Sequence, residues 1–361
     1  MNIALISPNK TSFSETFIET QKNGLKGNVF YYYDGFLPRY LDGEGRIQIK
    51  FGSLKKRLGL IYHDILSESL LQSFKNHKID VVLAQYGPTG EAVAPICEKL
   101  NIPIIVHFHG YDASIQTVIK KHDYYQDAFR VAKFVIAVSK VMVSDLIALG
   151  CPKDKIVYNP CAPNDIFYGI KPKFTKPQFL TIGRFTDKKA PYYTILAFKE
   201  VLKEYPKATL VFGGDGLLLN TCENLVKHLD IENNVSFRGV IEQHEFIGLL
   251  EESLAFVQHS ITADNGDKEG TPVAVMEASL AGLPVISTIH AGIPDVIINE
   301  RTGLLIKEHD VRGMTKFMIK LLNDLNYAKM LGQNGKEKVW NNYRLTIYLE
   351  KLQKALEKSI S

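Results

Sequence analysis

Two carboxylates, Glu269 and Glu277, stand on either side of a predicted helix start. Thr271 suits the N-cap position and Pro272 the first helical position of a helix that should end at Gly282. The N-terminus of a helix offers backbone N–H groups that bind phosphate. Positions 271 and 277 would lie about 9 Å apart along the helix axis, at about 1.5 Å per residue, which is about the span from a diphosphate to a ribose. The pattern therefore predicts a diphosphate site flanked by carboxylates that accept hydrogen bonds from sugar hydroxyls. The competing interpretation is a solvated surface glutamate followed by a buried helix with one polar residue.

A second polar pair, Arg184 and Lys189, lies between a predicted strand at 179–182 and a predicted helix at 191–203. Gly183 allows close backbone approach at this point. Arginine supplies a planar donor fork and lysine a point charge, and together they suit a diphosphate. The alternative is a solvated basic turn. The Glu269–Glu277 element favours the binding interpretation.

Two further loops follow predicted strands in the second half of the chain. Val240 comes after the strand predicted at 235–237, where backbone groups could contact a nucleobase. The glycine-rich run 213–216 lacks the GxGxxG and Walker spacings and predicts a tight strand-to-helix turn.

In the first half, His107 and His109 share one face at the end of a predicted strand, and Asp112 follows them. Two histidines and an aspartate could suggest a metal site, but no third cluster completes a ligand set, so we expect no metal. His109 is expected to be a polar residue at the carboxyl end of its strand, and a hydrogen-bonded core position is a reasonable alternative for His107. Ser14 suits the N-cap of a helix predicted at 15–24.

The elements that must position these residues alternate between strands and helices, which predicts parallel α/β sheets. Strands are expected at 3–6, 29–33, 81–84, 104–108, 134–138 and 156–158, and then at 179–182, 209–212, 235–237, 255–258, 285–287 and 304–306. Helices are expected at 56–74, 92–100, 140–149, 191–203, 217–228 and 242–251, and helices dominate from 310 to the end.

Two such alternations, joined by a proline-rich stretch at 159–176, predict two Rossmann-like domains that face each other across a cleft. Ligands of open α/β sheets bind beyond the carboxyl ends of the strands, so the cleft is the expected site. We place the first domain at 1–165, on the acceptor side, and the second, which would bind the nucleotide, at 166–345. A C-terminal helix at 346–361 is expected to cross back to the first domain.

The composition is that of an ordinary globular protein of 361 residues, with 45% hydrophobic and 23% charged residues. A formal net charge of +4 is too weak to suggest a nucleic-acid partner. The four cysteines are scattered, and the chain shows neither a signal peptide nor an apolar run of about 20 residues, so we expect a cytoplasmic protein. The stretch Arg46–Tyr62 mixes basic and apolar residues without an acidic one, which fits either docking on an anionic membrane or packing on its own domain.

These motifs together resemble family 4 of the retaining glycosyltransferases, which have the GT-B fold. The stretches that carry the likeness lie at 183–189, 269–277, 109–112, 281–285, 290–295 and 302–305. The start at 14–18 is similar to the colanic-acid and exopolysaccharide branch of that family. The likeness spans nearly the whole chain and is strongest from 179 to 306. Many relatives carry a glycine-rich loop after the first strand, whereas the loop 7–14 has no glycine here.

The resemblance implies a role for each matched position. Arg184 and Lys189 would hold the pyrophosphate of the donor, and Glu277 would bind the ribose hydroxyls. The other residues implied on the donor side are Glu269 and His109 at the donor sugar, the backbone of Gly270, Thr271 and Pro272 nearby, and Val240 near the base. Ser14 and Asp112 are the candidates on the acceptor side.

The activity implied is retaining transfer of a sugar from a UDP- or GDP-sugar to a hydroxyl of a lipid-linked or growing surface glycan. No metal or other cofactor is expected, because the Arg–Lys pair would do the work of a cation. One alternative is a non-hydrolysing sugar-nucleotide epimerase, which needs no acceptor, and another is a non-catalytic sugar-nucleotide-binding protein. A glycoside hydrolase that uses Glu269 and Glu277 as acid and base would not need the Arg–Lys pair.

Overall fold

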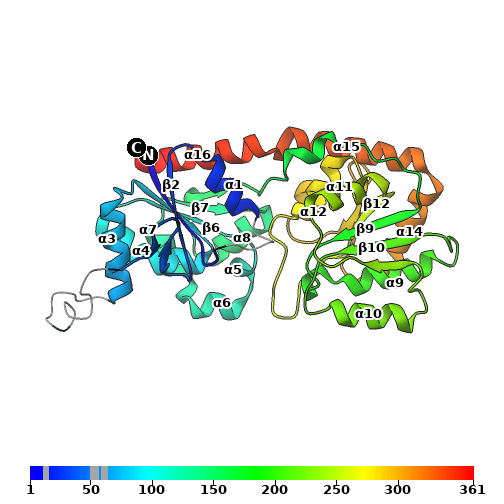
Figure 1. Ribbon diagram of the computed structural model, residues 1–361, viewed down its shortest axis with the longest axis horizontal. Helices are drawn as coiled ribbons and strands as arrows, with labels where there is room; N and C mark the ends of the chain where they lie inside the picture. Colours follow the sequence, from blue (N-terminus) through cyan, green and yellow to red (C-terminus); the bar gives the residue numbers. More distant parts are fainter. Residues whose placement is uncertain (11–15, 49–56, 58–63) are drawn as a thin grey trace. The chain divides into compact units, whose positions relative to one another are not determined.

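The computed structural model describes residues 1–10, 16–48, 57 and 64–361, which form two compact units (Figure 1). Unit 1 comprises Met1–Pro160 and Tyr348–Ser361, and unit 2 comprises Cys161–Ile347. Each unit contains one sheet of mainly parallel strands with helices, which confirms the predicted α/β class.

The sheet of unit 1 is ordered β4-β3-β2-β1-β5-β6-β7-β8. Its parallel strands are β1 (Asn2–Ile6), β2 (Asn28–Tyr33), β5 (Val81–Gln85), β6 (Ile104–His107), β7 (Phe134–Ala137) and β8 (Ile156–Tyr158). The short antiparallel strands β3 (Tyr40–Leu41) and β4 (Gly45–Arg46) extend one edge. The strand order reverses at β1, because its neighbours β2 and β5 lie on opposite sides.

The helices of unit 1 lie mainly between these strands along the chain. They are α1 (Thr16–Gly24), α3 (Ile65–Asn76), α4 (Gly87–Leu100), α5 (Tyr111–Ser114), α6 (Gln116–Lys121), α7 (Gln126–Val131) and α8 (Lys140–Ala148), with 3₁₀ turns η1 (Asp123–Tyr125) and η2 (Lys153–Lys155). Most of the last helix, α16 (Leu345–Ile360), also belongs to this unit. It packs beside the end of α1, where the Lys26 N–H donates to Gln353 Oε1 at 3.0 Å, and the two chain termini lie close together (Figure 1).

The sheet of unit 2 is ordered β11-β10-β9-β12-β13-β14, and all of its strand pairs are parallel. The strands are β9 (Gln178–Ile182), β10 (Thr209–Gly213), β11 (Val235–Phe237), β12 (Ala255–Gln258), β13 (Val285–Thr288) and β14 (Leu304–Ile306). The helices are α9 (Pro191–Val201), α10 (Leu219–His228), α11 (Gln243–Glu252), α12 (Val273–Ala281), α13 (Ile293–Val296), α14 (Val311–Asn323) and α15 (Leu325–Tyr343), with 3₁₀ turns η3 (Asp165–Gly169) and η4 (Asp187–Lys189).

The strands of unit 2 are buried on both faces, as expected of a parallel sheet covered by helices. Along β10, Leu210 and Phe212 pack into one apolar cluster with residues of α9 and α14. Val211, between them, points into a second cluster with residues of α11 and α12. The apolar runs from which we predicted the strands therefore reflect burial of both faces of the sheet, not an alternation of buried and exposed residues.

The predicted strands all occur, with ends that differ by one residue at most. The helix predicted at 92–100 begins at Gly87, because Pro88 fits the first turn of a helix and does not break it. The three short helices α5 to α7 were not predicted. Of the helix predicted at 56–74, the part from Ile65 is present, and most of what precedes it lies outside the described residues.

The stretch predicted as an irregular linker contains η3, and most of it belongs to unit 2. Phe167 and Ile170 are buried in the apolar cluster on the α11 and α12 side of the sheet. Proline-rich sequence therefore marks an ordered, packed segment here.

Glycines join the ends of the first strands of unit 2. The Gly183 N–H donates to the Gly213 carbonyl at 2.9 Å, and the Gly214 N–H donates to the Gly239 carbonyl at 2.6 Å. A Cβ atom at Gly214, where φ is +132°, would lie 2.0 Å from the carbonyl oxygen of Gly183. The run 213–216 is thus the tight turn that the sequence predicted.

We predict that Gly214→Ala destabilises the protein by at least about 3 kcal/mol, because a Cβ there meets rigid backbone at a left-handed φ. Gly239→Ala is the matched control: it also has a positive φ, of +66°, but a Cβ there would meet nothing within 4 Å. The control should lose only about 1–2 kcal/mol. Urea unfolding measures both losses, and equal losses would contradict the importance of this contact.

Candidate functional site

The candidate donor-side residues of unit 2 follow the carboxyl ends of its strands. Arg184 and Lys189 follow β9, Val240 follows β11, and Glu269 lies in the loop between β12 and α12. Strand order reverses between β9 and β12, which are neighbours in the sheet. Ligands of open α/β sheets bind at such a switch point. The fold therefore brings these candidate residues, which are far apart in the sequence, to the carboxyl edge of the unit 2 sheet.

Lys189 and Glu269 form an ion pair at this edge. The Lys189 Nζ lies 2.9 Å from Glu269 Oε1 and 3.2 Å from the Gln258 side-chain oxygen. Glu269 is only 7% exposed. Burial acts to raise the pKa of the Glu269 carboxyl, but the charges of Lys189 and then Lys188 outweigh it, so the pKa lies below its ordinary value. Glu269 is therefore ionised at neutral pH.

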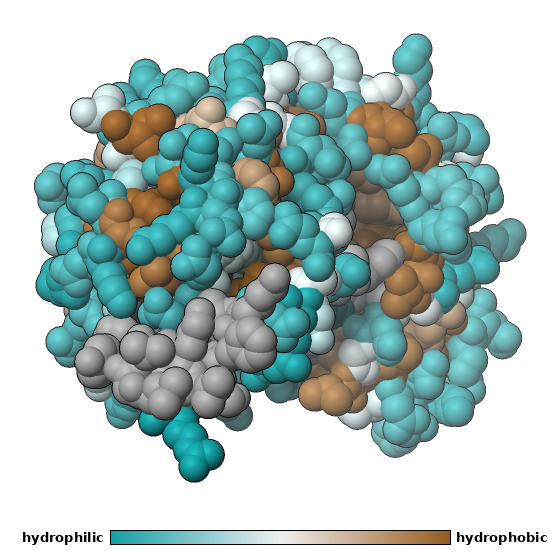
Figure 2. Space-filling model, turned by 60° about the vertical axis from the view of Figure 1, so that its left-hand side comes forward, coloured by the Kyte–Doolittle hydropathy of each residue, from teal (hydrophilic) through white to brown (hydrophobic). Residues whose placement is uncertain are grey.

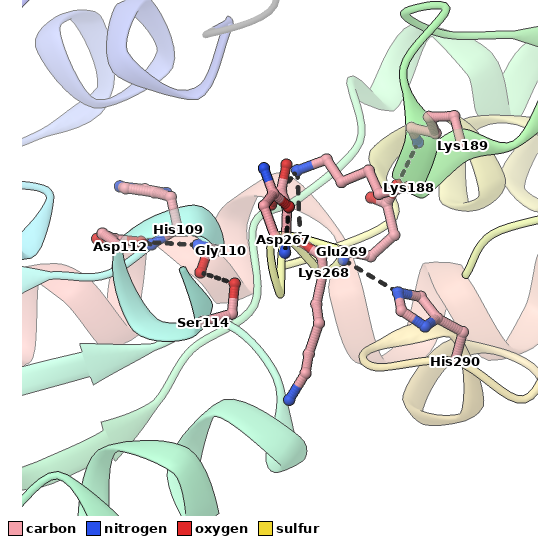
Figure 3. A network of polar contacts seen from close by, with 11 residues as sticks. His109, Gly110, Asp112, Ser114, Lys188, Lys189, Asp267, Lys268, Glu269 and His290 are labelled. Carbon is pink, nitrogen blue, oxygen red and sulfur yellow. Dashed lines mark hydrogen bonds and ion pairs between the residues drawn. The ribbon is translucent and has the colours of Figure 1, made fainter. Parts of the chain in front are cut away.

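A second ion pair lies beside the first, between Lys188 and Asp267 at 3.0 Å. The Lys188 ammonium also donates to the carbonyl of Lys268 at 3.3 Å (Figure 3). The Ile261 N–H donates to the backbone carbonyl of Lys188 at 3.0 Å. These contacts hold the loop that carries Glu269 against the turn that carries Lys188 and Lys189.

A buried histidine holds the backbone of Glu269 from the other side. The Glu269 N–H donates to His290 Nε2 at 3.2 Å (Figure 3), and His290 Nδ1 lies 2.7 Å from a Glu308 oxygen. His290 must therefore be the tautomer that donates from Nδ1 and accepts at Nε2. The other oxygen of Glu308 accepts from the Thr262 N–H at 3.0 Å. This series of hydrogen bonds fixes the backbone position from which the Glu269 side chain extends.

Arg184 differs from the lysines in that its side chain is exposed. Within the part of the chain that the structure describes, its guanidinium has no hydrogen-bond or ion-pair partner. An unpaired guanidinium at the end of β9, one turn before Lys189, is available to an anionic ligand.

Glu277 lies inside α12, half-buried, and its carboxylate also has no hydrogen-bond or ion-pair partner among the described residues. Burial raises the pKa of Glu277 to about 8. The carboxyl group is therefore mostly protonated at neutral pH in the free protein. A group that is costly to ionise and lacks an internal partner is well suited to a ligand that supplies hydroxyl donors.

The predicted start of this helix is wrong by one position. Pro272, with ψ of 74°, is the N-cap, and the first helical residue is Val273. Thr271 does not cap the helix, because its hydroxyl accepts a hydrogen bond from the Cys161 N–H at 3.0 Å. The helix still begins without a side-chain cap, and it ends at Gly282 in the left-handed conformation, as predicted.

In unit 1, His109 belongs to a chain of buried polar side chains. His109 Nε2 lies 2.8 Å from Gln85 Oε1, and the Gln85 amide donates to Gln21 Oε1 at 2.7 Å. The Gln21 amide in turn donates to the hydroxyl of Tyr348 at 2.5 Å and lies 3.3 Å from His107 Nδ1. His109 therefore donates from Nε2 and keeps Nδ1 as an acceptor.

The ring of His109 is stacked on Phe17, with 4.2 Å between ring centroids. Burial and then the neighbouring His107 hold the pKa of His109 well below its ordinary value, so the imidazole is neutral at pH 7. His107 is fully buried, in keeping with the core alternative, and burial lowers its pKa to about 3.

Asp112 is fully buried and supports the loop before α5. Its carboxylate accepts from the N–H group of Gly87 at 3.0 Å. It also accepts from the N–H groups of His109 and Gly110 at 3.0 and 2.8 Å (Figure 3). These bonds hold the backbone of His109 and Gly110 in place, and a contact between Asp112 and an acceptor stays a prediction. Ser14, the other acceptor-side candidate, lies outside the described residues, as does most of Arg46–Tyr62.

Sequence reasoning missed the residues that hold the candidates in place. In unit 2 these are Gln258, His290 and Glu308, and in unit 1 they are Gln21, Gln85 and Tyr348. Gln258 and Gln85 do carry a signal, because they are polar residues at the last position of, and directly after, the strands predicted at 255–258 and 81–84.

We predict that Glu277→Gln stabilises the free protein as pH rises. The folded-state pKa of about 8 exceeds the ordinary value of 4.5, so the wild type loses stability between these values and no further above them. The variant has no carboxyl to ionise, and its advantage should reach roughly 1–3 kcal/mol near pH 8. Urea unfolding at several pH values tests this, with the exposed Glu232→Gln as control. If the variant is no more stable than the wild type, or if the difference in stability does not change with pH, the raised pKa of Glu277 is refuted.

No helix in the described part of the chain is long and apolar enough to span a membrane. On the face seen in Figure 2, hydrophilic residues cover most of the surface, and apolar residues form separate small patches.

Comparison with known proteins gives consistent matches. Residues 166–338 match the family described as "Glycosyl transferases group 1", and residues 29–164 match "Glycosyltransferase Family 4". The colanic acid biosynthesis glycosyltransferase WcaL of Escherichia coli, itself described as putative, is 27% identical over 300 residues, which are 81% of this chain and 74% of WcaL. The amylovoran biosynthesis glycosyltransferase AmsK of Erwinia amylovora is 28% identical over 301 residues, covering 75% of this chain and 74% of AmsK.

Among solved structures, HepE of Anabaena in complex with UDP-glucose is similar over 99% of this chain and all of that chain, with a TM-score of 0.80 and 16% identity. The sucrose-phosphate synthase of Thermosynechococcus elongatus has a TM-score of 0.76 over 99% of this chain and 98% of that chain, at 18% identity. These likenesses confirm the predicted GT-B fold. Because the two family descriptions together span residues 29–338, the chain belongs to the glycosyltransferases, with residues 29–164 matching family 4.

Proposed function

We propose that this protein is a retaining, metal-independent glycosyltransferase of exopolysaccharide assembly. It moves a sugar from a UDP- or GDP-sugar to a hydroxyl of a lipid-linked or growing surface glycan. WcaL and AmsK, whose names place them in exopolysaccharide biosynthesis, support the pathway class, and the UDP-glucose complex of HepE supports a nucleotide-sugar donor.

The observation that carries the proposal is that Arg184 and Lys189 both follow β9 at the switch point of the unit 2 sheet, with the Lys189 side chain lying against Gly183. Cleavage of the bond between the anomeric carbon and the diphosphate leaves negative charge on the diphosphate. Fixed cations placed where this charge develops lower the barrier. Arg184 is unpaired among the described residues, and Lys189 is held beside Glu269.

The uncapped start of α12 adds backbone donors for the same diphosphate. Gly270, Thr271 and Pro272 lead into this start and are proposed to lie along the donor. The Arg184–Lys189 pair is proposed to stabilise the leaving diphosphate without a metal ion.

The two glutamates take different roles in this proposal. Glu269 is ionised and rigidly held, and it accepts hydrogen bonds from the donor sugar. Glu277 receives the ribose hydroxyls, and Val240, which is 55% exposed, lies beside the base. We assign neither as a covalent nucleophile or as an acid–base pair, because Glu269 is committed to Lys189 and Glu277 sits within a helix.

His109 is proposed to contact the donor sugar near the reacting carbon, as the family resemblance implies. A neutral imidazole with Nδ1 as an acceptor can receive a hydrogen bond from a sugar hydroxyl. The acceptor glycan is proposed to be presented at the inner face of a membrane, with the basic and apolar sequence Arg46–Tyr62 as the contact.

We predict that Lys189→Ala lowers turnover about 10²- to 10³-fold, because one charge that stabilises the leaving group is lost. The assay measures release of nucleoside diphosphate from the sugar nucleotide that the wild type uses. UDP or GDP should raise the melting temperature of the wild type and raise that of the variant less. The exposed Lys207→Ala serves as the control for loss of a positive charge.

Removing Lys189 also leaves Glu269 buried without its ion pair, which destabilises the fold. The double variant Lys189→Ala/Glu269→Gln removes that charge and should recover the melting temperature without recovering turnover. Near-normal turnover in Lys189→Ala would refute the role of Lys189. If neither UDP nor GDP stabilises the wild type, the proposed donor class is wrong.

We also predict that the first-formed product keeps the anomeric configuration of the donor and that excess EDTA leaves the rate unchanged. Proton NMR of the anomeric signal during the first turnovers reports the configuration. An inverted product would exclude the retaining mechanism. A rate that falls in EDTA and recovers with added Mg²⁺ or Mn²⁺ would exclude metal independence.

A further inference from the structure

A hollow that no part of the proposed donor site uses lies in unit 1, at the ends of β1 and β2. Its volume is about 470 Å³, and it is lined by Pro8, Asn9, Lys10, Tyr33, Asp34 and Tyr40. Three of these residues lie two to four positions after the end of β1, two stand at or directly after the end of β2, and Tyr40 begins β3. The hollow therefore lies at the carboxyl edge of the sheet, beside the point where strand order reverses.

Tyrosine rings form one wall of this hollow. Tyr33 and Tyr40 are cross-strand partners, and their rings stack with 5.5 Å between centroids and 11° between planes. Tyr31 continues the row at 5.8 Å from Tyr33. Tyr31 is buried, whereas Tyr33 and Tyr40 are partly exposed, and neither of their hydroxyls has a hydrogen-bond partner within the described residues. The wall thus presents aromatic surface together with two available hydroxyls.

Charged groups surround the rings. The Lys10 ammonium lies 5.2 Å from the centre of the Tyr33 ring, and Arg39 lies 3.6 Å from a carboxylate oxygen of Asp34. The side chains of Asp34 and Arg39 are 47% and 56% exposed. A carboxylate and two cations next to aromatic rings can accept from and donate to the hydroxyls of one sugar ring, while its C–H face packs on the rings.

Backbone and side-chain hydrogen bonds join the segments that line the hollow. The Tyr31 hydroxyl donates to the carbonyl of Asn9 at 2.5 Å, and the Gly35 N–H donates to the carbonyl of Pro8 at 3.0 Å. Asp34 has a φ of +73°, in the left-handed region that aspartate and asparagine adopt more readily than other non-glycine residues.

We propose that this hollow, here named the tyrosine hollow, is a saccharide subsite that binds one sugar unit of the acceptor glycan. Tyr40 and Tyr33 pack on the sugar ring, and Asp34 accepts hydrogen bonds from its hydroxyls. The assignment of the sugar to an acceptor rests on the proposed glycosyl transfer, whereas sugar binding itself does not.

The test uses ligand-observed NMR without any donor. The probes are the methyl glycosides of glucose, galactose, mannose and glucuronic acid, each added to the full-length protein. At least one should receive saturation from the wild type at its ring C–H protons. Tyr40→Ala should weaken that binding about tenfold, which is the scale of one lost aromatic contact. Tyr40→Phe keeps the aromatic ring and should retain most of the glycoside binding.

Asp34→Asn should also weaken binding, since asparagine tolerates the left-handed φ and only the charge is lost. Tyr124→Ala, at a 41% exposed tyrosine of unit 1 that does not line the hollow, is the matched control and should bind like the wild type. The shift in melting temperature with UDP or GDP should be the same in all these variants.

Two results of the glycoside experiment would overturn the subsite, and a third would come from the nucleotide measurement. One is that no glycoside binds the wild type, and the other is that Tyr40→Ala binds as the wild type does. Loss of the UDP or GDP shift in Tyr40→Ala would instead assign the hollow to the nucleotide and would also refute the proposal. If glycosides bind as expected but no nucleotide does, the subsite stands and the proposed transfer falls, so the two proposals fail separately.

Discussion

The ion pair between Lys189 and Glu269 is the interaction on which the polar edge of unit 2 depends. Two charges held largely out of water are stable only when each has a partner and further hydrogen bonds. Gln258 meets the lysine, and His290 with Glu308 fixes the backbone of the glutamate. The pair lies where strand order reverses, so the same bonds that make it stable also place it where a ligand binds. Under the proposed function, a diphosphate that binds Lys189 would compete with Glu269 for the ammonium group, and a sugar hydroxyl that binds Glu269 would compensate for that loss.

Other polar residues of the site divide according to whether the protein itself satisfies them. Asp112 and His290 are buried and fully engaged by backbone and side-chain partners, so their task is to hold other residues in place. Arg184 and Glu277 have no such partner among the described residues, and the half-buried Glu277 has its pKa raised by burial. A polar group left without an internal partner is costly in the free protein and gains most from a ligand. This division separates binding candidates from positioning residues more sharply than residue type does.

In unit 1, neutral polar side chains hold a candidate residue, His109, in place. His109 reaches the C-terminal helix α16 through Gln85, Gln21 and the hydroxyl of Tyr348, and each bond fixes the orientation of the next side chain. The last segment of the chain thereby sets the tautomer of a histidine near its beginning. The tyrosine hollow lies on the same sheet and is framed by the β2–β3 hairpin, an antiparallel addition to an otherwise parallel arrangement. A common α/β core can in this way carry a locally built surface, and the proposed saccharide subsite lies on it.

Sequence by itself determined the α/β class and every strand except the short β3 and β4, and it named the donor-side candidates, whose roles stay predictions. Parallel strands covered on both faces need continuous apolar runs, and glycine, proline and charged residues cluster where those runs end. The sequence misplaced the start of α12, because the hydroxyl of Thr271 bonds to the backbone of Cys161, 110 positions away. Only the tertiary structure decided that Lys189 meets Glu269, that Asp112 serves the loop before α5, and that Tyr33 faces Tyr40. The physical reason is that local propensity reports what a segment can form, whereas the partner of a buried polar group is chosen by strand order, which brings together residues that are far apart in the chain.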